Sequence, residues 1–228
     1  MNYQLLKVKD SIKKLNQNRA PGPDNINIEI IKIDTTDIFA NLHKIINRVW
    51  RIEKLPSEWE EGLICPIFKK GDPLECKNYR GITLLNSAYK VFSNILHERL
   101  KVHVEKEIGN YQCGFSPGKS TINQIHTLRQ IIEKTREYSR NTHHLFVDFE
   151  AAYDSINKEK LIMAMEELRI PTKLIRLTKN IINNAKCKIK LPKGQSTAFH
   201  TNKGIRQGDS LAWTLCNISL EKVVRDVG

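Results

Sequence analysis

The run LFVDF at residues 145–149 places one carboxylate, Asp148, inside an otherwise apolar stretch. Residues 144–149 therefore predict a buried β-strand. Because an unpaired carboxylate is costly to bury, Asp148 is expected at the edge of a sheet, where it binds a ligand. Mg²⁺ is the leading candidate, since hard cations prefer carboxylate oxygens. The alternative is a structural aspartate that caps the following turn.

Two more residues with useful chemistry follow Asp148 closely. The ring of Tyr153 can form a floor beneath a bound sugar, although the residue by itself favours simple core packing. Asp154 is a candidate second metal ligand, yet a carboxylate at such a position more commonly caps or pairs locally. By themselves these two residues do not indicate a binding site, and they do so only together with the other motifs.

Two other segments suit phosphate. In the loop 204–209, which reads GIRQGD, glycines let the backbone approach a ligand closely, and the following helix N-terminus attracts phosphate. This is not a P-loop, because the GxxxxGKS or GxxxxGKT spacing is absent, and an ordinary capped loop is the alternative. Lys69, Lys70 and Arg80 flank a predicted turn, where a guanidinium can grip a triphosphate through two bonds. A solvated basic loop is the alternative there.

The composition narrows the class of partner. The 228 residues carry a net charge of +12, which indicates nucleic acid first and an anionic membrane second. Five widely spaced cysteines, none in a CxxC pair, argue against a disulfide framework or a zinc site and favour a reducing compartment. Neither a membrane-spanning run nor a signal peptide is expected. We therefore expect an intracellular protein, in either the nucleus or the cytoplasm.

Residue patterning predicts the elements that must position these groups. Helices are predicted over 7–16, 36–52, 87–107, 157–168 and 172–183, and Asp209 caps a final one that ends near 227. Ser120 caps another, which carries apolar residues at helical spacing, namely Ile122, Ile125, Leu128 and Ile132. Further strands are predicted over 63–68, 82–85 and 187–191, and a turn at 192–194 forms a hairpin with 196–200. The class is α+β, helix-rich with a short antiparallel sheet.

Six motifs occur in the order typical of one family: NRAPGPD at 18–24, PIFKKGD at 66–72, NYRGITLL at 78–85, QCGFSPGKST at 112–121, FVDFEAAYD at 146–154 and GIRQGD at 204–209. Together, over about residues 5–228, they resemble the reverse transcriptase of non-LTR, LINE-like retrotransposons, and the wording is nearest to RTE-like elements. Group II intron maturases and viral RNA polymerases share the palm of this fold. The first and third motifs argue against both.

The resemblance implies a right-hand polymerase, with fingers at about 1–140 and part of the palm at about 141–228. It implies an RNA-directed DNA polymerase that uses two Mg²⁺ or Mn²⁺ ions, an RNA template, a DNA primer and deoxynucleoside triphosphates, with no membrane. Asp148 would be the catalytic, metal-binding carboxylate. The residues matching nucleotide contacts are Lys69, Arg80, Tyr153, Gln207 and Gly208. Those matching template contacts are Gly114, Lys119, Ser120, Thr121 and Arg206.

The sequence departs from the family in three places. It contains no Asp-Asp pair, and the hairpin that carries that pair and the thumb are expected to be absent. No polymerase activity is therefore expected from this chain alone, and a non-catalytic basic RNA- or DNA-binding relic is the alternative. Ser116 stands where the family usually has arginine, and Trp213 stands where it usually has proline. The large indole is expected to reshape the start of the last helix.

Overall fold

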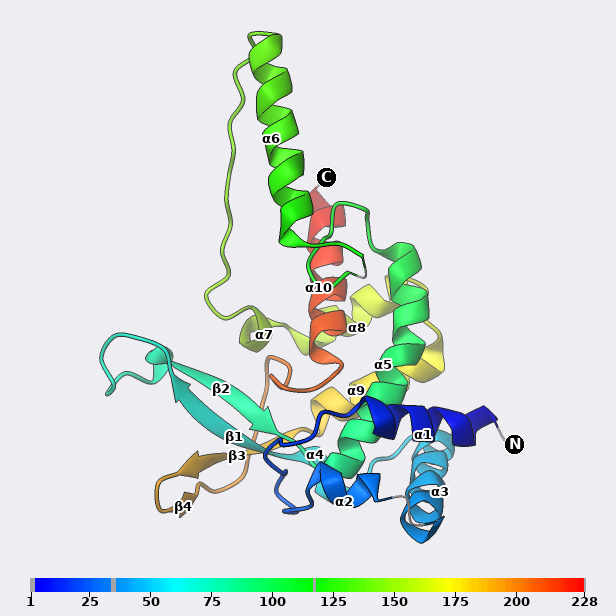
Figure 1. Ribbon diagram of the computed structural model, residues 1–228. Helices are drawn as coiled ribbons and strands as arrows, with labels where there is room; N and C mark the ends of the chain where they lie inside the picture. Colours follow the sequence, from blue (N-terminus) through cyan, green and yellow to red (C-terminus); the bar gives the residue numbers. More distant parts are fainter. Residues whose placement is uncertain (1–2, 34–35, 117, 228) are drawn as a thin grey trace.

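A computed structural model describes residues 3–33, 36–116 and 118–227. The helices gather on one side of a small sheet whose strands extend away from them, and one long helix projects from the body (Figure 1). The N-terminal part contains α1 (Tyr3–Lys14), α2 (Ile28–Lys32), α3 (Thr36–Ile52) and α4 (Ser57–Glu60). The helix predicted over 36–52 is confirmed at both ends. The α+β class is confirmed as well.

The sheet has the strand order β2-β1-β3-β4, and β5 also pairs with β3. Strands β1 (Glu61–Phe68) and β2 (Tyr79–Leu84) form an antiparallel hairpin, with the short 3-10 helix Cys76–Asn78 in its connection. Strand β3 (Lys186–Leu191) turns back antiparallel into β4 (Gly194–Gln195) and β5 (Phe199–His200), as the predicted hairpin requires. However, β1 and β3 run parallel. The sheet is therefore mixed and not wholly antiparallel, because a long helical crossover separates those two strands.

Helix α5 (Ser87–Glu107) forms the centre of the core, with the predicted bounds. Its fully buried residues Tyr89, Phe92, Leu96 and Leu100 recur every three or four positions, which makes one continuous buried side. Helices α1, α9 and α10 all pack against it. The Trp59 ring closes the end of this core, 5.8 Å from the ring of Phe92.

Helices α8 (Lys158–Glu167), α9 (Thr172–Asn183) and α10 (Ala212–Val227) pack together beside α5. The Asn157 side chain caps α8 by accepting the backbone N–H groups of Glu159 and Lys160, each at 3.0 Å. Asp209 accepts the N–H of Leu211 at 3.1 Å, ahead of α10. All three helices were predicted from the sequence, the last with Asp209 as its cap, and their existence is confirmed.

Helix α6 (Thr121–Glu137) projects from the body, and none of its side chains is buried (Figure 1). The predicted cap is confirmed, since Asn123 Oδ1 accepts the Ser120 N–H at 2.8 Å in a capping box. Its predicted apolar side faces solvent, and Ile122 is 73% exposed. Within the described ranges, no helix combines the length and apolar character needed to cross a bilayer.

The strand predicted over 144–149 is wrong for this structure. Residues 140–149 run as an extended segment from α6 back to the body and pair with no strand among the described residues (Figure 1). Leu145 is 88% exposed and Phe146 is 78% exposed. A run of β-forming residues supplies propensity, whereas a strand also needs a neighbouring strand to accept its hydrogen bonds and cover its side chains.

Candidate nucleotide and template site

The loop 204–209 lies between two other segments and is hydrogen-bonded to both. On one side, Gly204 N–H donates to the Ile156 carbonyl at 2.8 Å, and Ile205 N–H donates to the Tyr153 carbonyl at 3.0 Å. On the other side, Thr83 N–H of β2 donates to the Gln207 carbonyl at 2.7 Å. The loop therefore ties β2 to the short helix α7 (Ala152–Ser155).

Both glycines of this loop are required by close backbone approach. Gly204 has a φ of +80°, and a Cβ there would lie 2.8 Å from the Cα of Asp154. Gly208 has a φ of +110°, and a Cβ there would lie 2.8 Å from the Thr83 carbonyl oxygen. Any side chain would separate the loop from its neighbours, so the two glycines allow the three segments to meet.

A polar bridge crosses this junction. Arg80 Nε donates to Gln207 Oε1 at 3.0 Å, and Gln207 Nε2 donates to Asp154 Oδ2 at 3.1 Å. Because a guanidinium only donates and a carboxylate only accepts, the two partners together define the orientation of the amide. The sequence left Asp154 open between metal ligation and local pairing. In this structure its carboxylate pairs with Gln207.

Tyr153 precedes Asp154 in α7 and is half-buried against the hydrophobic core. Burial raises the pKa of its hydroxyl, while Arg80 acts in the opposite direction. The hydroxyl is therefore protonated at neutral pH. Tyr153 directly precedes Asp154, the last residue of the Arg80–Gln207–Asp154 bridge. Packing of its ring against the core is therefore compatible with a role beside the bridge.

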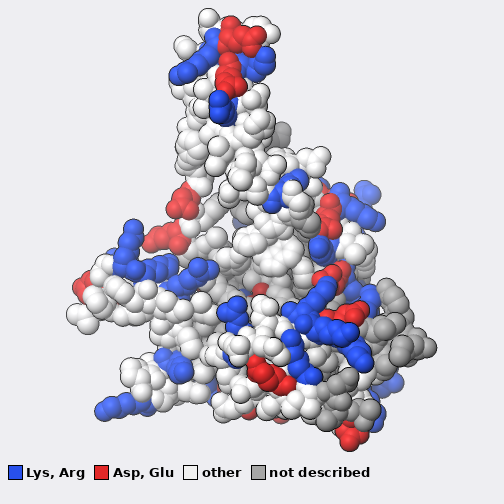
Figure 2. Space-filling model, viewed as in Figure 1, with Lys and Arg blue, Asp and Glu red and all other residues white. Residues whose placement is uncertain are grey.

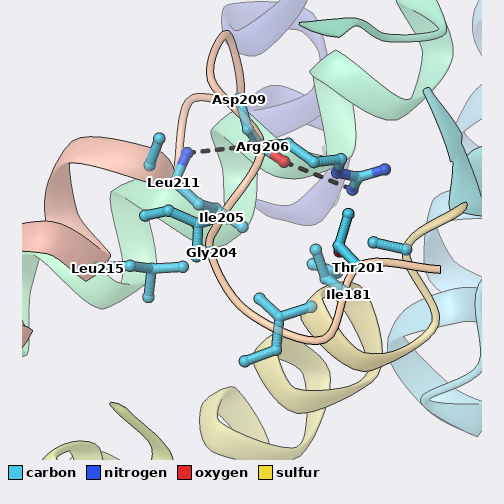
Figure 3. A pocket seen from close by; sticks show the side chains of 11 residues that line it. Ile181, Thr201, Gly204, Ile205, Arg206, Asp209, Leu211 and Leu215 are labelled. Carbon is cyan, nitrogen blue, oxygen red and sulfur yellow. Dashed lines mark hydrogen bonds and ion pairs between the residues drawn. The ribbon is translucent and has the colours of Figure 1, made fainter. Parts of the chain in front are cut away.

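Arg206 points into the protein and is only 8% exposed. Its guanidinium donates to the Trp59 and Glu60 carbonyls at 3.4 Å and lies 4.6 Å above the Tyr89 ring. Figure 3 shows its ion pair with the Asp209 carboxylate, at 3.5 Å. The space beneath the loop is about 20 Å³, room for one water at most. A template contact for Arg206 does not fit this placement, because its charge is used inside the protein.

Asp209 completes the buried network. Its two carboxylate oxygens accept the hydroxyl protons of Tyr89 and Ser93 on α5. Burial raises the pKa of Tyr89 well above its usual range, which keeps that hydroxyl protonated as a donor. Sequence reasoning assigned neither residue. The signal that could have found them is the polar series Tyr89, Ser93 and His97, which recurs every four residues on the buried side of a helix.

Lys69 and Lys70 are exposed at the tip of the β1–β2 hairpin, where Figure 2 shows basic side chains gathered. The ladder continues beyond the strands, since Lys69 N–H donates to the Asn78 carbonyl at 2.8 Å. Arg80 lies opposite Ile67 in the register, so alternation puts Arg80 and Lys69 on the same face of the hairpin. The two predicted triphosphate contacts therefore share one face.

Four of the predicted template residues lie in the turn before α6. Asn217 of α10 donates to the Gly114 carbonyl at 3.0 Å and accepts from the Gln112 amide at 3.0 Å. Lys119 Nζ donates to the Asn110 carbonyl at 2.7 Å, which draws the turn together. Ser120 and Thr121 are exposed at the N-terminus of α6. These four residues are adjacent, while Arg206 lies apart from them in the interior.

Asp148 lies in the extended segment with its side chain exposed. Across residues 3–33, 36–116 and 118–227, no hydrogen bond or ion pair holds its carboxylate. In the same ranges, no three His, Cys, Asp or Glu side chains gather as metal ligands. A two-ion centre needs several oxygen ligands around shared positions. The described residues therefore do not form one by themselves, and metal ligation by Asp148 stays a prediction.

Comparison with known proteins gives the family. A family model described as reverse transcriptase (RNA-dependent DNA polymerase) matches residues 67–228. The chain is 26% identical to the probable RNA-directed DNA polymerase from transposon BS of Drosophila melanogaster, over 92% of this chain and 23% of that protein. It is 26% identical to the RNA-directed DNA polymerase from mobile element jockey of Drosophila funebris, over 94% and 24%.

A third relative, the transposon TX1 uncharacterized 149 kDa protein of Xenopus laevis, is 22% identical over 92% of this chain and 16% of its own length. The chain thus spans about a sixth to a quarter of these three relatives. Since the family model covers more than half of the chain, this protein belongs to the reverse transcriptase family, on the non-LTR retrotransposon branch that its motifs resemble.

Proposed function

We propose that this chain is the nucleotide- and template-holding part of an RNA-directed DNA polymerase, which adds deoxynucleotides to a primer 3′-hydroxyl on an RNA template. The observation that carries the proposal is the bridge from Arg80 through Gln207 to Asp154. It joins three segments far apart in sequence, and two of its residues are those that the family resemblance assigns to the nucleotide. Tyr153 lies next to it in α7.

In this reaction the primer 3′-oxygen attacks the α-phosphorus, the bond to the bridging oxygen breaks, and pyrophosphate leaves. Two Mg²⁺ or Mn²⁺ ions, when bound, stabilise the attacking and leaving oxygens. Asp148 would supply one carboxylate to them. The other proposed roles are positional: Lys69 and Arg80 neutralise the triphosphate, and Tyr153 lies beneath the sugar.

Gln207 and Gly208 would lie beside the incoming nucleotide. The amide of Gln207 is held from both ends, so it is oriented before a nucleotide arrives. Gly208 lets the loop backbone lie directly against β2, since a Cβ there would be 2.8 Å from the Thr83 carbonyl oxygen, and this contact keeps the neighbouring Gln207 in place. Preorganisation of this kind favours binding because little ordering is left to be done on association.

The proposed template contacts are Gly114, Lys119, Ser120 and Thr121. Ser120 and Thr121 lie at the N-terminus of α6, where the positive end of the helix dipole attracts phosphate. The net charge of +12 supports a polyanionic partner. If about four phosphates of a single strand are neutralised, the slope of log affinity against log salt should be about -3. A slope near zero, measured by fluorescence anisotropy with labelled RNA, would contradict this part of the proposal.

The nucleotide site is tested by titrating deoxynucleoside triphosphate into the full chain bound to an RNA–DNA template–primer, with Mg²⁺ present. Arg80→Ala should weaken nucleotide binding at least about tenfold, since it removes a charged hydrogen-bonding group. Lys77→Ala is the matched control, because Lys77 is an exposed cation on the same hairpin. Equal affinities for wild type and Arg80→Ala would contradict the proposed site.

A second candidate is a non-catalytic nucleic-acid-binding module, favoured by the lack of a three-ligand metal cluster within the described residues. Such a module would bind RNA or DNA with no dependence on metal or nucleotide. Primer extension on an RNA template with Mg²⁺ or Mn²⁺ separates the two. No extension is expected from this chain alone, and incorporation that disappears in Asp148→Ala would overturn that expectation.

Finer assignments belong to the same proposal. We place the chain among RTE-like elements inside the cell, and we divide it into fingers at about 1–140 and palm at about 141–228. The five free cysteines support the reducing compartment. The division is one of function and not of independent folding, because α9 and α10 pack on α5 and β3 pairs with β1.

A further inference from the structure

Three rings form a column at the side of α10, outside the proposed nucleotide site. The innermost ring is that of His97 on α5, which is buried and hydrogen-bonded to Thr214 Oγ1 at 2.9 Å. The Trp213 ring lies next, with its centroid 4.5 Å from that of His97 and its plane tilted by 60°, so these two rings are in contact without stacking. The Phe115 ring stacks on Trp213 at 6.1 Å with an interplanar angle of 27°. The column thus ends on the outer face of Phe115.

The outermost ring is exposed although it is apolar. Phe115 is 64% exposed, so one face of it meets solvent while the other faces Trp213. Its backbone has a φ of +54°, a conformation that residues other than glycine rarely adopt. Backbone strain of this kind persists only when the surroundings impose it, and it gathers at functional sites.

Residues of α10 hold the turn that contains Phe115. Asn217 is buried on α10, one helical turn after Trp213, and its amide donates to the Gly114 carbonyl at 3.0 Å. The Gln112 amide in turn donates to Asn217 Oδ1 at 3.0 Å. One helix therefore holds both the backbone of this turn, through Asn217, and the Phe115 ring, through Trp213. The Phe115 ring therefore already lies against Trp213 in the absence of a ligand.

A groove of about 310 Å³ opens beside the column. Its lining includes the aromatic pair, the C-terminal part of α5, and the side chains of Lys101 and Lys119. The lining also holds Glu105, whose carboxylate is 3.6 Å from the Lys101 ammonium, so these two charges offset each other and the net positive charge of the lining is that of Lys119. The groove therefore combines an exposed aromatic face with basic groups, the combination that binds single-stranded nucleic acid through stacked bases and backbone charge.

We propose that the outer face of Phe115, supported by Trp213, is a stacking step for one unpaired base of the RNA template. The inference rests on the proposed template-binding function and deepens it, since the ring lies between Gly114 and the other predicted template residues. Trp213 stands where the family usually has proline, so the supporting indole is a feature of this chain. The base stacks on Phe115 while its phosphates pass the lysines.

The test is RNA binding by the full chain, measured by fluorescence anisotropy with single-stranded oligonucleotides that carry one abasic nucleotide at successive positions. For the wild-type chain, one abasic position should weaken binding about 5- to 150-fold, the range that one base–aromatic stack covers. Phe115→Leu keeps an apolar side chain without a flat ring. It should bind intact RNA about as weakly as wild type binds the abasic RNA, and it should lose nothing further when the base is removed.

Phe115→Tyr restores a ring and should restore both the affinity and the penalty of the abasic position. Tyr138→Leu is the matched control, because Tyr138 is 68% exposed and lies at the far end of α6. It should bind like wild type. If Phe115→Leu binds like wild type, or keeps the abasic penalty, the stacking step is overturned while template binding stands. If the wild-type chain fails to bind RNA at every salt concentration tested, the proposed function itself is contradicted.

Discussion

Two segments that carry family motifs behave in opposite ways. The loop 204–209 is hydrogen-bonded on both sides, its glycines touch neighbouring backbone, and its Arg206 and Asp209 side chains are buried partners. The segment 140–149 is extended, unpaired within the described chain, and exposes Leu145, Phe146 and Val147. Both segments carry a motif typical of the family, so the presence of a motif did not decide whether a segment is packed or exposed. The loop is hydrogen-bonded to β2 and α7, whereas residues 140–149 pair with no strand among the described residues and leave most of their apolar side-chain surface exposed.

The largest effect is expected in the interior of the loop network. Asp209→Ala removes the carboxylate that faces Arg206 and accepts from Tyr89 and Ser93. Breaking a buried charge pair costs about 3–5 kcal/mol because the remaining charge is left uncompensated. Urea unfolding measures the change. The control Glu133→Ala breaks an exposed ion pair with Arg129 and should cost at most about 1 kcal/mol.

If Asp209→Ala and Glu133→Ala cost the same, the loop network does not stabilise the fold, and the contrast with the extended segment disappears.

A smaller effect is expected at the backbone contact of the loop. Gly204→Ala should lower the free energy of unfolding by about 1–3 kcal/mol, because the residue has a positive φ and its Cβ would press on the Asp154 backbone. Gly118→Ala separates the two causes. Gly118 has a φ of +72° with open space around it, so that variant feels only the backbone conformation. Thermal unfolding measures both variants. Equal losses of stability would show that the close contact between Gly204 and the Asp154 backbone contributes nothing to the effect.

The bridge at the edge of the loop should affect nucleotide binding more than stability. Asp154→Ala removes one exposed hydrogen bond to Gln207 and should change unfolding by less than about 1 kcal/mol. It also releases the amide, so deoxynucleotide affinity should fall several-fold, measured by titration on template–primer. Asp154→Asn can accept or donate and should recover only part of that affinity. Unchanged affinity in Asp154→Ala would assign the bridge to structure alone.

The smallest effect is expected in the extended segment. Leu145→Asn should change the free energy of unfolding by less than about 0.5 kcal/mol, because the side chain is 88% exposed. Leu161→Ala, at a buried position of α8, should cost about 2–5 kcal/mol in the same assay. A large loss for Leu145→Asn would mean that this segment is covered in solution, and it would break the comparison.

The helices were largely predictable because their signals are local. Apolar residues at three- and four-residue spacing marked 36–52 and 87–107 with the observed bounds, and the helix predicted over 172–183 also has them. The strands 63–68 and 82–85 were predicted as well, whereas their antiparallel pairing as β1 and β2 came from the structure. The parallel pairing of β1 with β3 was not predicted, because it depends on how the helices between them pack.

The candidate site was predictable in composition but only partly in geometry. The family motifs selected Arg80, Gln207 and Tyr153, and the structure brings their segments together. They also selected Arg206 and Asp148, which lie in the interior and in the extended segment. The local sequence around a charged residue such as Arg206 is the same whether its side chain faces solvent or the core. Burial is decided by which neighbours supply a compensating charge.

The sequence by itself determined the family, the helices and the glycines of the loop, because motif wording, helical periodicity and capping act within a few residues. Only the tertiary structure decided that Arg206 faces Asp209, that Asp154 holds Gln207, that Phe115 stacks on Trp213, and that residues 140–149 remain without a paired strand. Each of these depends on a partner distant in the chain. A side chain's partner is set by packing, which local sequence does not encode.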